Sequence, residues 1–114
     1  MRLRSLTFAT LLLVPSIAFS HSKAEQTTPA NNAIVDMVEL IEIRFDSPMR
    51  VTAISMTGPE GDVMISRETG LDPVTEFRAS PVAPLGGGEY RIQWRGLAAD
   101  GHPMQGSFNF TVAN

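Results

Sequence analysis

The sequence predicts an all-β domain, a small Greek-key β-sandwich or barrel of the immunoglobulin-like type, that follows a cleaved signal peptide. Short stretches in which apolar and polar residues alternate recur along the chain, and this period of two is typical of strands with one buried face. Turns containing Gly and Pro separate the stretches, as in domains built from many short strands. No long segment after the leader has helical periodicity.

Residues 1–20 have the parts of a secretory signal peptide. Arg2 and Arg4 give a positive start, and an apolar run over residues 8–14 follows. This run is shorter than the roughly 20 residues that a membrane-spanning helix needs, which argues against a membrane anchor. The pattern predicts export through the secretory pathway, with residues 21–114 as the mature domain.

The cleavage site decides which residue begins the mature chain. Ala18 and Ser20 are the small residues expected before a cut, so we expect cleavage after Ser20 and a new N-terminus at His21. A cut after Ala24, with Ser22 as the upstream small residue, also fits the rule and would remove His21.

Composition excludes several classes of function. Loss of the leader removes two arginines, which lowers Lys plus Arg from 9 to 7 against 12 Asp plus Glu and gives a net charge of −5. The sequence has no basic cluster, so we expect no nucleic-acid partner. Without cysteine the chain has no disulfides, thiolate metal sites or cysteine nucleophiles. One small domain of this kind is expected to be a monomer.

The first half of the mature chain predicts an extended lead-in and two strands. Residues 21–33 are polar and contain Pro29, which favours an extended segment over a helix. A strand is expected within residues 34–45, where apolar and charged residues alternate, with a turn at residues 46–48 to end it. Residues 51–57 are rich in β-branched side chains and predict the next strand.

The second half contains the clearest strand signals. Tyr90, Ile92 and Trp94 alternate with polar residues, so we expect them on the core face of a strand. A loop at residues 98–106 connects this strand to the last one, and the later strands are expected at residues 63–65, 75–79, 90–95 and 107–112.

The loop contains the sequence Asp100-Gly101-His102-Pro103. Asp-Gly is a common turn signal, and read alone this stretch predicts a structural turn. If the stretch is extended, however, Asp100 and His102 point to the same side of the chain. A carboxylate and an imidazole together suit Cu(II), Ni(II) or Zn(II).

His21, one of only two histidines in the chain, completes a candidate metal site. An N-terminal histidine offers its α-amine and ring Nδ1 to one metal ion, and both lose protons readily near neutral pH. A third nitrogen from His102 leaves room for an oxygen from Asp100 or water. Tetragonal nitrogen and oxygen coordination is what Cu(II) prefers, so the expected metal ligands are His21, Asp100 and His102.

At this point the chain resembles a known family. The segments IEIRFDSPM at residues 41–49 and GGGEYRIQWRGLAADGHPMQGSFNFTV at residues 86–112 are similar to those of the copper resistance protein C (CopC) family. The resemblance implies a small Greek-key β-barrel in the periplasm that binds Cu(II) through its N-terminal histidine and the Asp and His of the DGH motif. Those positions correspond to His21, Asp100 and His102. An inner-membrane copper transporter of the CopD type is the implied partner.

The methionines depart from the pattern of some relatives. Family members that bind Cu(I) carry a methionine cluster, because thioether sulfur is a soft ligand. Here the methionines after the leader are scattered singly, so we expect a Cu(II) site only, and they are Met37, Met49, Met56, Met64 and Met104.

The sequence thus predicts a Cu(II)-binding protein for copper buffering, resistance or delivery, with no catalytic residues. Two alternatives are a copper-dependent oxidative enzyme that uses the same pair of histidines, known as a histidine brace, and a metal-free immunoglobulin-like interaction module. The role of Asp100, as a direct ligand or as a support for His102, also stays open at this point.

Overall fold

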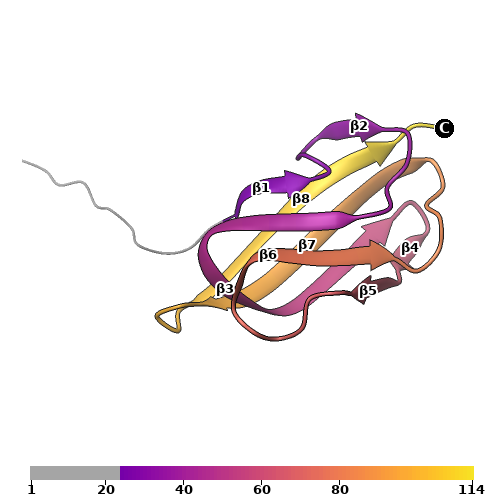
Figure 1. Cartoon of the computed structure of the whole chain (residues 1–114). Helices are drawn as coiled ribbons and strands as arrows, with labels where there is room; N and C mark the ends of the chain where they lie inside the picture. The colour runs from indigo at the N-terminus through magenta and orange to yellow at the C-terminus, as the bar shows by residue number, and fades with distance from the viewer. Residues whose placement is uncertain (1–23) are drawn as a thin grey trace, which may run out of the picture.

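The computed structural model describes residues 24–114, which form two layers of β-strands (Figure 1). His21 and the leader lie outside the described residues. All regular structure in the described part of the chain is strand, which confirms the predicted all-β class, and this part contains no helix long and apolar enough to cross a membrane. The strands are β1 (Ala24–Thr28), β2 (Ala33–Val35), β3 (Ile41–Gly58), β4 (Gly61–Val63), β5 (Ile65–Arg67), β6 (Val74–Pro81), β7 (Gly88–Ala98) and β8 (Pro103–Val112).

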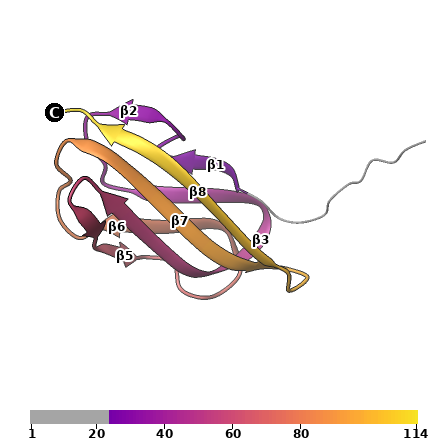
Figure 2. The ribbon, with the colours of Figure 1, turned by 180° about the vertical axis from the view of Figure 1, so that it is seen from behind.

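Strand β3 belongs to both layers. Its first part pairs with β1 on one side and with β6 on the other, and β6 pairs in turn with β5. Its second part pairs with β7 and β4, and β7 continues through β8 to β2. Figure 2, seen from behind, shows β7 and β8 in front of the layer that contains β6. One long strand therefore connects the two layers of the sandwich.

The predicted turn at residues 46–48 is wrong, because β3 continues through this segment. The pairing with β6 jumps from Arg44 opposite Glu76 to Met49 opposite Val74, so residues 45–48 of β3 stand opposite a single residue of β6, Thr75. Such an insertion bends a strand and interrupts its hydrogen-bond ladder. Proline, which has no N–H to donate, is tolerated where the ladder is interrupted. The chain bends here and passes into the other layer instead of reversing.

Other strand boundaries also differ from the prediction. The strand expected at residues 63–65 is divided, because β4 pairs with β3 whereas β5 pairs with β6. The lead-in contains a paired strand, β1. Strand β8 begins at Pro103, so the loop expected at residues 98–106 is a short turn at residues 99–102.

The core lies between the layers and is formed by the apolar side of each strand. The predicted orientation of β7 is confirmed, because Tyr90, Ile92 and Trp94 are buried. Trp94 contacts Phe45 edge to face, with ring centroids 5.1 Å apart, and Tyr90 stacks on Phe110 at 5.4 Å. Aromatic pairs at these distances add to the stabilisation from burial. The largest fully buried side chains are Phe77, Phe110, Ile41, Ile43, Met49, Met56, Ile92 and Val51.

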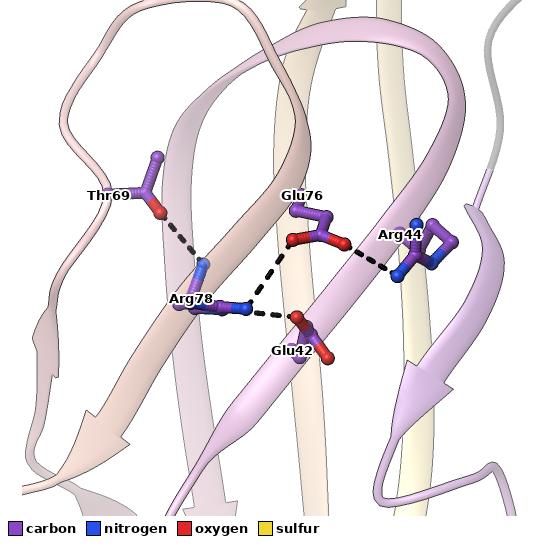
Figure 3. Close-up of polar contacts among 5 residues, drawn as sticks. All are labelled: Glu42, Arg44, Thr69, Glu76 and Arg78. Carbon is purple, nitrogen blue, oxygen red and sulfur yellow. Dashed lines mark hydrogen bonds and ion pairs between the residues drawn. The ribbon is translucent and has the colours of Figure 1, made fainter.

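The outer face of β3 and β6 carries a chain of ion pairs (Figure 3). Arg78 lies between two carboxylates, with Nε 3.1 Å from Glu42 and Nη2 3.4 Å from Glu76, and Glu76 also contacts Arg44. The hydrogen bond to Glu42, followed by the charges of Glu42 and Glu76, raises the pKa of Arg78 above its ordinary value. Exposed pairs of this kind contribute little to stability. They do neutralise both arginines of this face.

Candidate metal centre

The β7–β8 hairpin presents the loop that the sequence singles out. The two strands pair without interruption from Gly88 opposite Val112 to Leu97 opposite Pro103. Beyond that pair, Ala98 N donates to His102 O at 2.9 Å, and Gly101 N donates to Ala98 O at 2.8 Å. Gly101 has a φ of +89°, which residues with a side chain rarely adopt. The turn is therefore closed by the backbone and positions its side chains firmly.

Asp100 and His102 contact each other in this turn. One carboxylate oxygen of Asp100 accepts a hydrogen bond from His102 N at 3.0 Å, and the other lies 2.7 Å from His102 Nδ1. The turn that the Asp-Gly sequence predicts is confirmed, and the two side chains meet within it rather than on one side of an extended segment. The segment turns, and the short Asp side chain bonds to the backbone two residues later, as Asp commonly does in turns. Both side chains are open to solvent, with 62% of His102 and 48% of Asp100 exposed.

The contact with Asp100 determines how His102 meets a metal ion. A neutral imidazole that donates from Nδ1 carries its lone pair on Nε2, so Nε2 is the nitrogen that can coordinate. Metal-bound histidines commonly donate their other ring N–H to a carboxylate, which fixes the ring and makes it a better ligand. The observed geometry suits Asp100 to this supporting position beside His102.

The start of the described chain lies at the same end of the sandwich as this turn. Ala24, the first described residue, pairs with Phe45, and Met49 a few residues later pairs with Ala98 at the end of β7. Figures 1 and 2 both show the beginning of β1 and the β7–β8 turn at one end, with the C-terminus at the other. The packing of Phe45 on Trp94 joins the two layers near this end.

The described residues contain two of the three predicted ligands. His21 lies outside them, so the distance from His21 to Asp100 and His102 is not defined. Among residues 24–114 no group of three His, Asp or Glu side chains is arranged to bind a metal ion. The methionines differ in burial. Met49 and Met56 lie in the core, whereas Met37 and Met64 are exposed to solvent.

The fold and the turn define a class of protein: a small all-β domain that carries an exposed, carboxylate-supported imidazole at the end of a hairpin. The model of the CopC domain matches residues 24–113, and the chain belongs to the CopC family.

Relatives in sequence have the same family name. Copper resistance protein C of Pseudomonas syringae pv. tomato is 31% identical over 115 residues, which cover 92% of this chain and 90% of the relative. Copper resistance protein C of Escherichia coli is also 31% identical, over 88% of this chain and 90% of the relative.

Solved structures of related proteins have the same fold. PcoC, a methionine-rich copper resistance protein from Escherichia coli, is 27% identical with a TM-score of 0.68 and aligns over 82% of this chain and 99% of its own. CopC from Methylosinus trichosporium OB3b is 26% identical with a TM-score of 0.70, over 82% of this chain and 94% of its own. Membership of this family indicates a copper-related function.

Proposed function

We propose that this protein binds Cu(II) through the α-amine and Nδ1 of His21 and through Nε2 of His102, with Asp100 at or beside the remaining position. The observation that carries the proposal is the 2.7 Å contact between His102 Nδ1 and Asp100 in an exposed turn of a CopC domain. This contact orients the imidazole ring, and imidazole nitrogen is a preferred ligand of Cu(II).

The reach of the N-terminal segment supports the role of His21. Three residue steps separate His21 from Ala24, and an extended chain covers about 10 Å in three steps. Ala24 pairs beside Phe45 at the end of the sandwich where residues 99–102 lie. A mature chain that begins at His21 would therefore have its terminus within about 10 Å of Ala24, at this end of the sandwich.

Chemistry also favours Cu(II) over Cu(I). The proposed ligands are nitrogen and oxygen, which suit Cu(II), whereas Cu(I) favours thioether sulfur. Met49 and Met56 are buried in the apolar core, where a copper ion would need to displace packed side chains. The protein would therefore buffer or deliver Cu(II) without turnover.

The proposed cellular setting follows from the leader. Residues 1–20 would be a signal peptide, and residues 21–114 would be a periplasmic domain that acts as a monomer. The partner that the family resemblance implies would be an inner-membrane copper transporter of the CopD type. The names of the relatives, copper resistance protein C, agree with a role in copper handling.

Signal peptidase would create the site, and this gives the sharpest test. We would compare Cu(II) binding of the chain that begins at His21 with the same chain carrying one added Gly, by competition titration and electron paramagnetic resonance. The added residue turns the amine into an amide, so affinity should fall by orders of magnitude and the spectrum should change. Equal affinities and identical spectra would overturn the brace, and no Cu(II) binding by either chain would overturn the function. Intact mass of the exported protein checks the cleavage after Ser20.

A further inference from the structure

The arginines of the described chain divide into two groups. Arg44 and Arg78 are neutralised by Glu42 and Glu76 on the outer face of β3 and β6. Arg67 lies over the ring of Phe77 at 5.0 Å.

Arg67 is also used within the fold, because its guanidinium donates to the carbonyl oxygens of Val51, Thr69 and Gly70. The remaining arginines, Arg50, Arg91 and Arg95, are all exposed. Arg50 donates to Leu71 O at 2.7 Å, and Arg91 donates to Ser107 Oγ at 3.1 Å and to Asn109 Oδ1 at 3.4 Å. None of the three makes an ion pair with any carboxylate that the structure describes.

These three arginines share one surface. Residues directly opposite each other in an antiparallel pair point to the same face of a sheet. Arg95 of β7 lies between Ala53 and Gln105, and Arg91 lies between Thr57 and Asn109.

We call this surface the arginine face, because the three arginines are the charged side chains at its centre. Leu97 lies between Arg50 and Pro103, and Gln93 lies between Ser55 and Ser107. The members of the face are Arg50, Ala53, Ser55, Thr57, Arg91, Gln93, Arg95, Leu97, Pro103, Gln105, Ser107 and Asn109.

Carboxylates border the arginine face without neutralising it. Asp62 of β4 lies beside Thr57, and Glu89 precedes Arg91 by one step on the same side of β7. Asp100 lies in the turn at the other end and contacts His102. Among the described residues, three of the four arginines that make no ion pair thus lie on one polar sheet face, in a chain with 12 acidic and 9 basic residues.

The arginine face is hollowed rather than flat. One open depression of about 600 Å³ is lined by Arg91, Gln93 and Arg95. A second, of about 750 Å³, is lined by Arg95, Leu97 and Pro103. Arg95 lines both depressions, so the two lie next to each other along β7.

We propose that the arginine face docks an extended acidic segment of a partner protein, with carboxylates four residues apart. Arg91 and Arg95 are four residues apart on one strand, a distance of about 13 Å. Two carboxylates four residues apart on an extended ligand chain have the same separation. A guanidinium binds a carboxylate through two parallel hydrogen bonds. Gln93 and Ser107 offer further hydrogen bonds between the two arginines.

A protein ligand fits this face better than a membrane does. Among the large hydrophobic residues of the arginine face only Leu97 is exposed, at 37%, so little apolar surface is available for insertion between lipids. The net negative charge of the chain also opposes approach to an anionic bilayer. A short acidic peptide covers only the arginine face, so it meets less repulsion from the carboxylates elsewhere on the protein.

The test uses a defined peptide and matched variants. The probe is acetyl-Gly-Glu-Ser-Thr-Ser-Glu-Gly-amide, and its control has Gln in place of both Glu residues. The processed protein, labelled with ¹⁵N and kept with a chelator, is titrated at low ionic strength. Amide shifts should change along β7 and β8 with the Glu peptide and not with the Gln peptide. Affinity should fall as salt is raised.

Two double variants of equal charge localise the binding. Arg91→Gln with Arg95→Gln should weaken the peptide at least tenfold, whereas Arg44→Gln with Arg78→Gln should change affinity less than twofold. An equal loss of peptide affinity in the two double variants, or no binding of the Glu peptide to the parent protein, would overturn the proposal. Binding to vesicles of phosphatidylglycerol that depends on Arg91 and Arg95, without peptide binding, would overturn it in favour of a membrane surface.

The inference is independent of the proposed copper site. The variant His102→Ala should keep the full affinity for the peptide while it loses Cu(II). Loss of peptide binding in this variant would contradict a separate docking face, and failure of Cu(II) binding in the parent chain would leave the peptide result unchanged.

Discussion

The indole of Trp94 lies against Gly106, its partner across the β7–β8 ladder. A Cβ atom at Gly106 would be 2.7 Å from Trp94 Nε1 and 2.8 Å from two ring carbons, closer than real side chains approach. Trp94 is 4% exposed and its ring also contacts Phe45. The absence of a side chain at this one strand position lets a large ring close the core near the turn that carries Asp100 and His102.

Gly106→Ala should therefore destabilise the protein by about 1–3 kcal/mol, because the ring and the backbone must move apart to fit the added methyl group. Urea unfolding followed by far-UV circular dichroism measures this change. Gly70→Ala is the control, since no atom lies within 4 Å of its Cβ position, and it should change stability by less than about 0.5 kcal/mol. Equal effects of the two substitutions would contradict the packing described for Trp94.

Tyr90→Phe tests the anchor of the loop before β7. The Tyr90 hydroxyl donates to Gly86 O at 2.7 Å from a side chain that is 6% exposed. Removal of the hydroxyl should cost about 0.5–1.5 kcal/mol in the free energy of unfolding, while the stacking on Phe110 is retained. The measurement is the urea midpoint at an unchanged m-value. A variant as stable as the parent would show that this hydrogen bond contributes nothing.

The proposed ligands should differ in their effects on Cu(II) affinity. His102→Ala removes a nitrogen ligand and should weaken binding by at least about 100-fold, because imidazole is a stronger donor to Cu(II) than carboxylate. Asp100→Ala should cost less, about 10–100-fold, as for residues that support a metal ligand. Glu89→Ala, an exposed carboxylate at the other end of β7, is the matched control and should leave affinity unchanged. The reverse order of the two losses would refute the assigned roles.

Burial should also determine which methionines react with peroxide. Hydrogen peroxide transfers one oxygen atom to a thioether and leaves a sulfoxide and water, and exposed sulfur reacts first. Met37 and Met64 are 65% and 74% exposed, whereas Met49 and Met56 are 0% and 1% exposed. Peptide mass spectrometry over a time course should find sulfoxide at the first two well before the others. Early oxidation of Met49 would contradict its place in the core.

The strands that the sequence predicted best are those with a regular period of two. The alternation at Tyr90, Ile92 and Trp94 identifies both the strand and its buried face, because one side of β7 meets the core and the other meets water. The bend of β3 was not predictable in the same way. Asp46, Ser47 and Pro48 are typical turn residues, and local preference alone does not distinguish a turn from a bulge in a continuing strand.

For the candidate site, the sequence predicted both the turn at Asp100-Gly101 and the pairing of Asp100 with His102. The extended form of this segment, which would also place the two side chains together, is not adopted, and they meet because the Asp side chain bonds within the tight turn. The arginine face was missed altogether. Its arginines alternate with apolar residues on β7, which is also the pattern of an ordinary solvated strand. Only the pairing of β7 with its neighbours shows that carboxylates are absent from the centre of that face, among the residues that the structure describes.

The shared strand β3 couples the stability of one layer to that of the other. Two sheets held only by side-chain packing can separate along the plane between them, but here the backbone from Ile41 to Gly58 runs through both layers and keeps them joined. We therefore expect the ladder with β6 and the ladder with β7 to open in one cooperative event. Amide protons in the two parts of β3 should exchange with solvent at the same limiting free energy, equal to that of global unfolding.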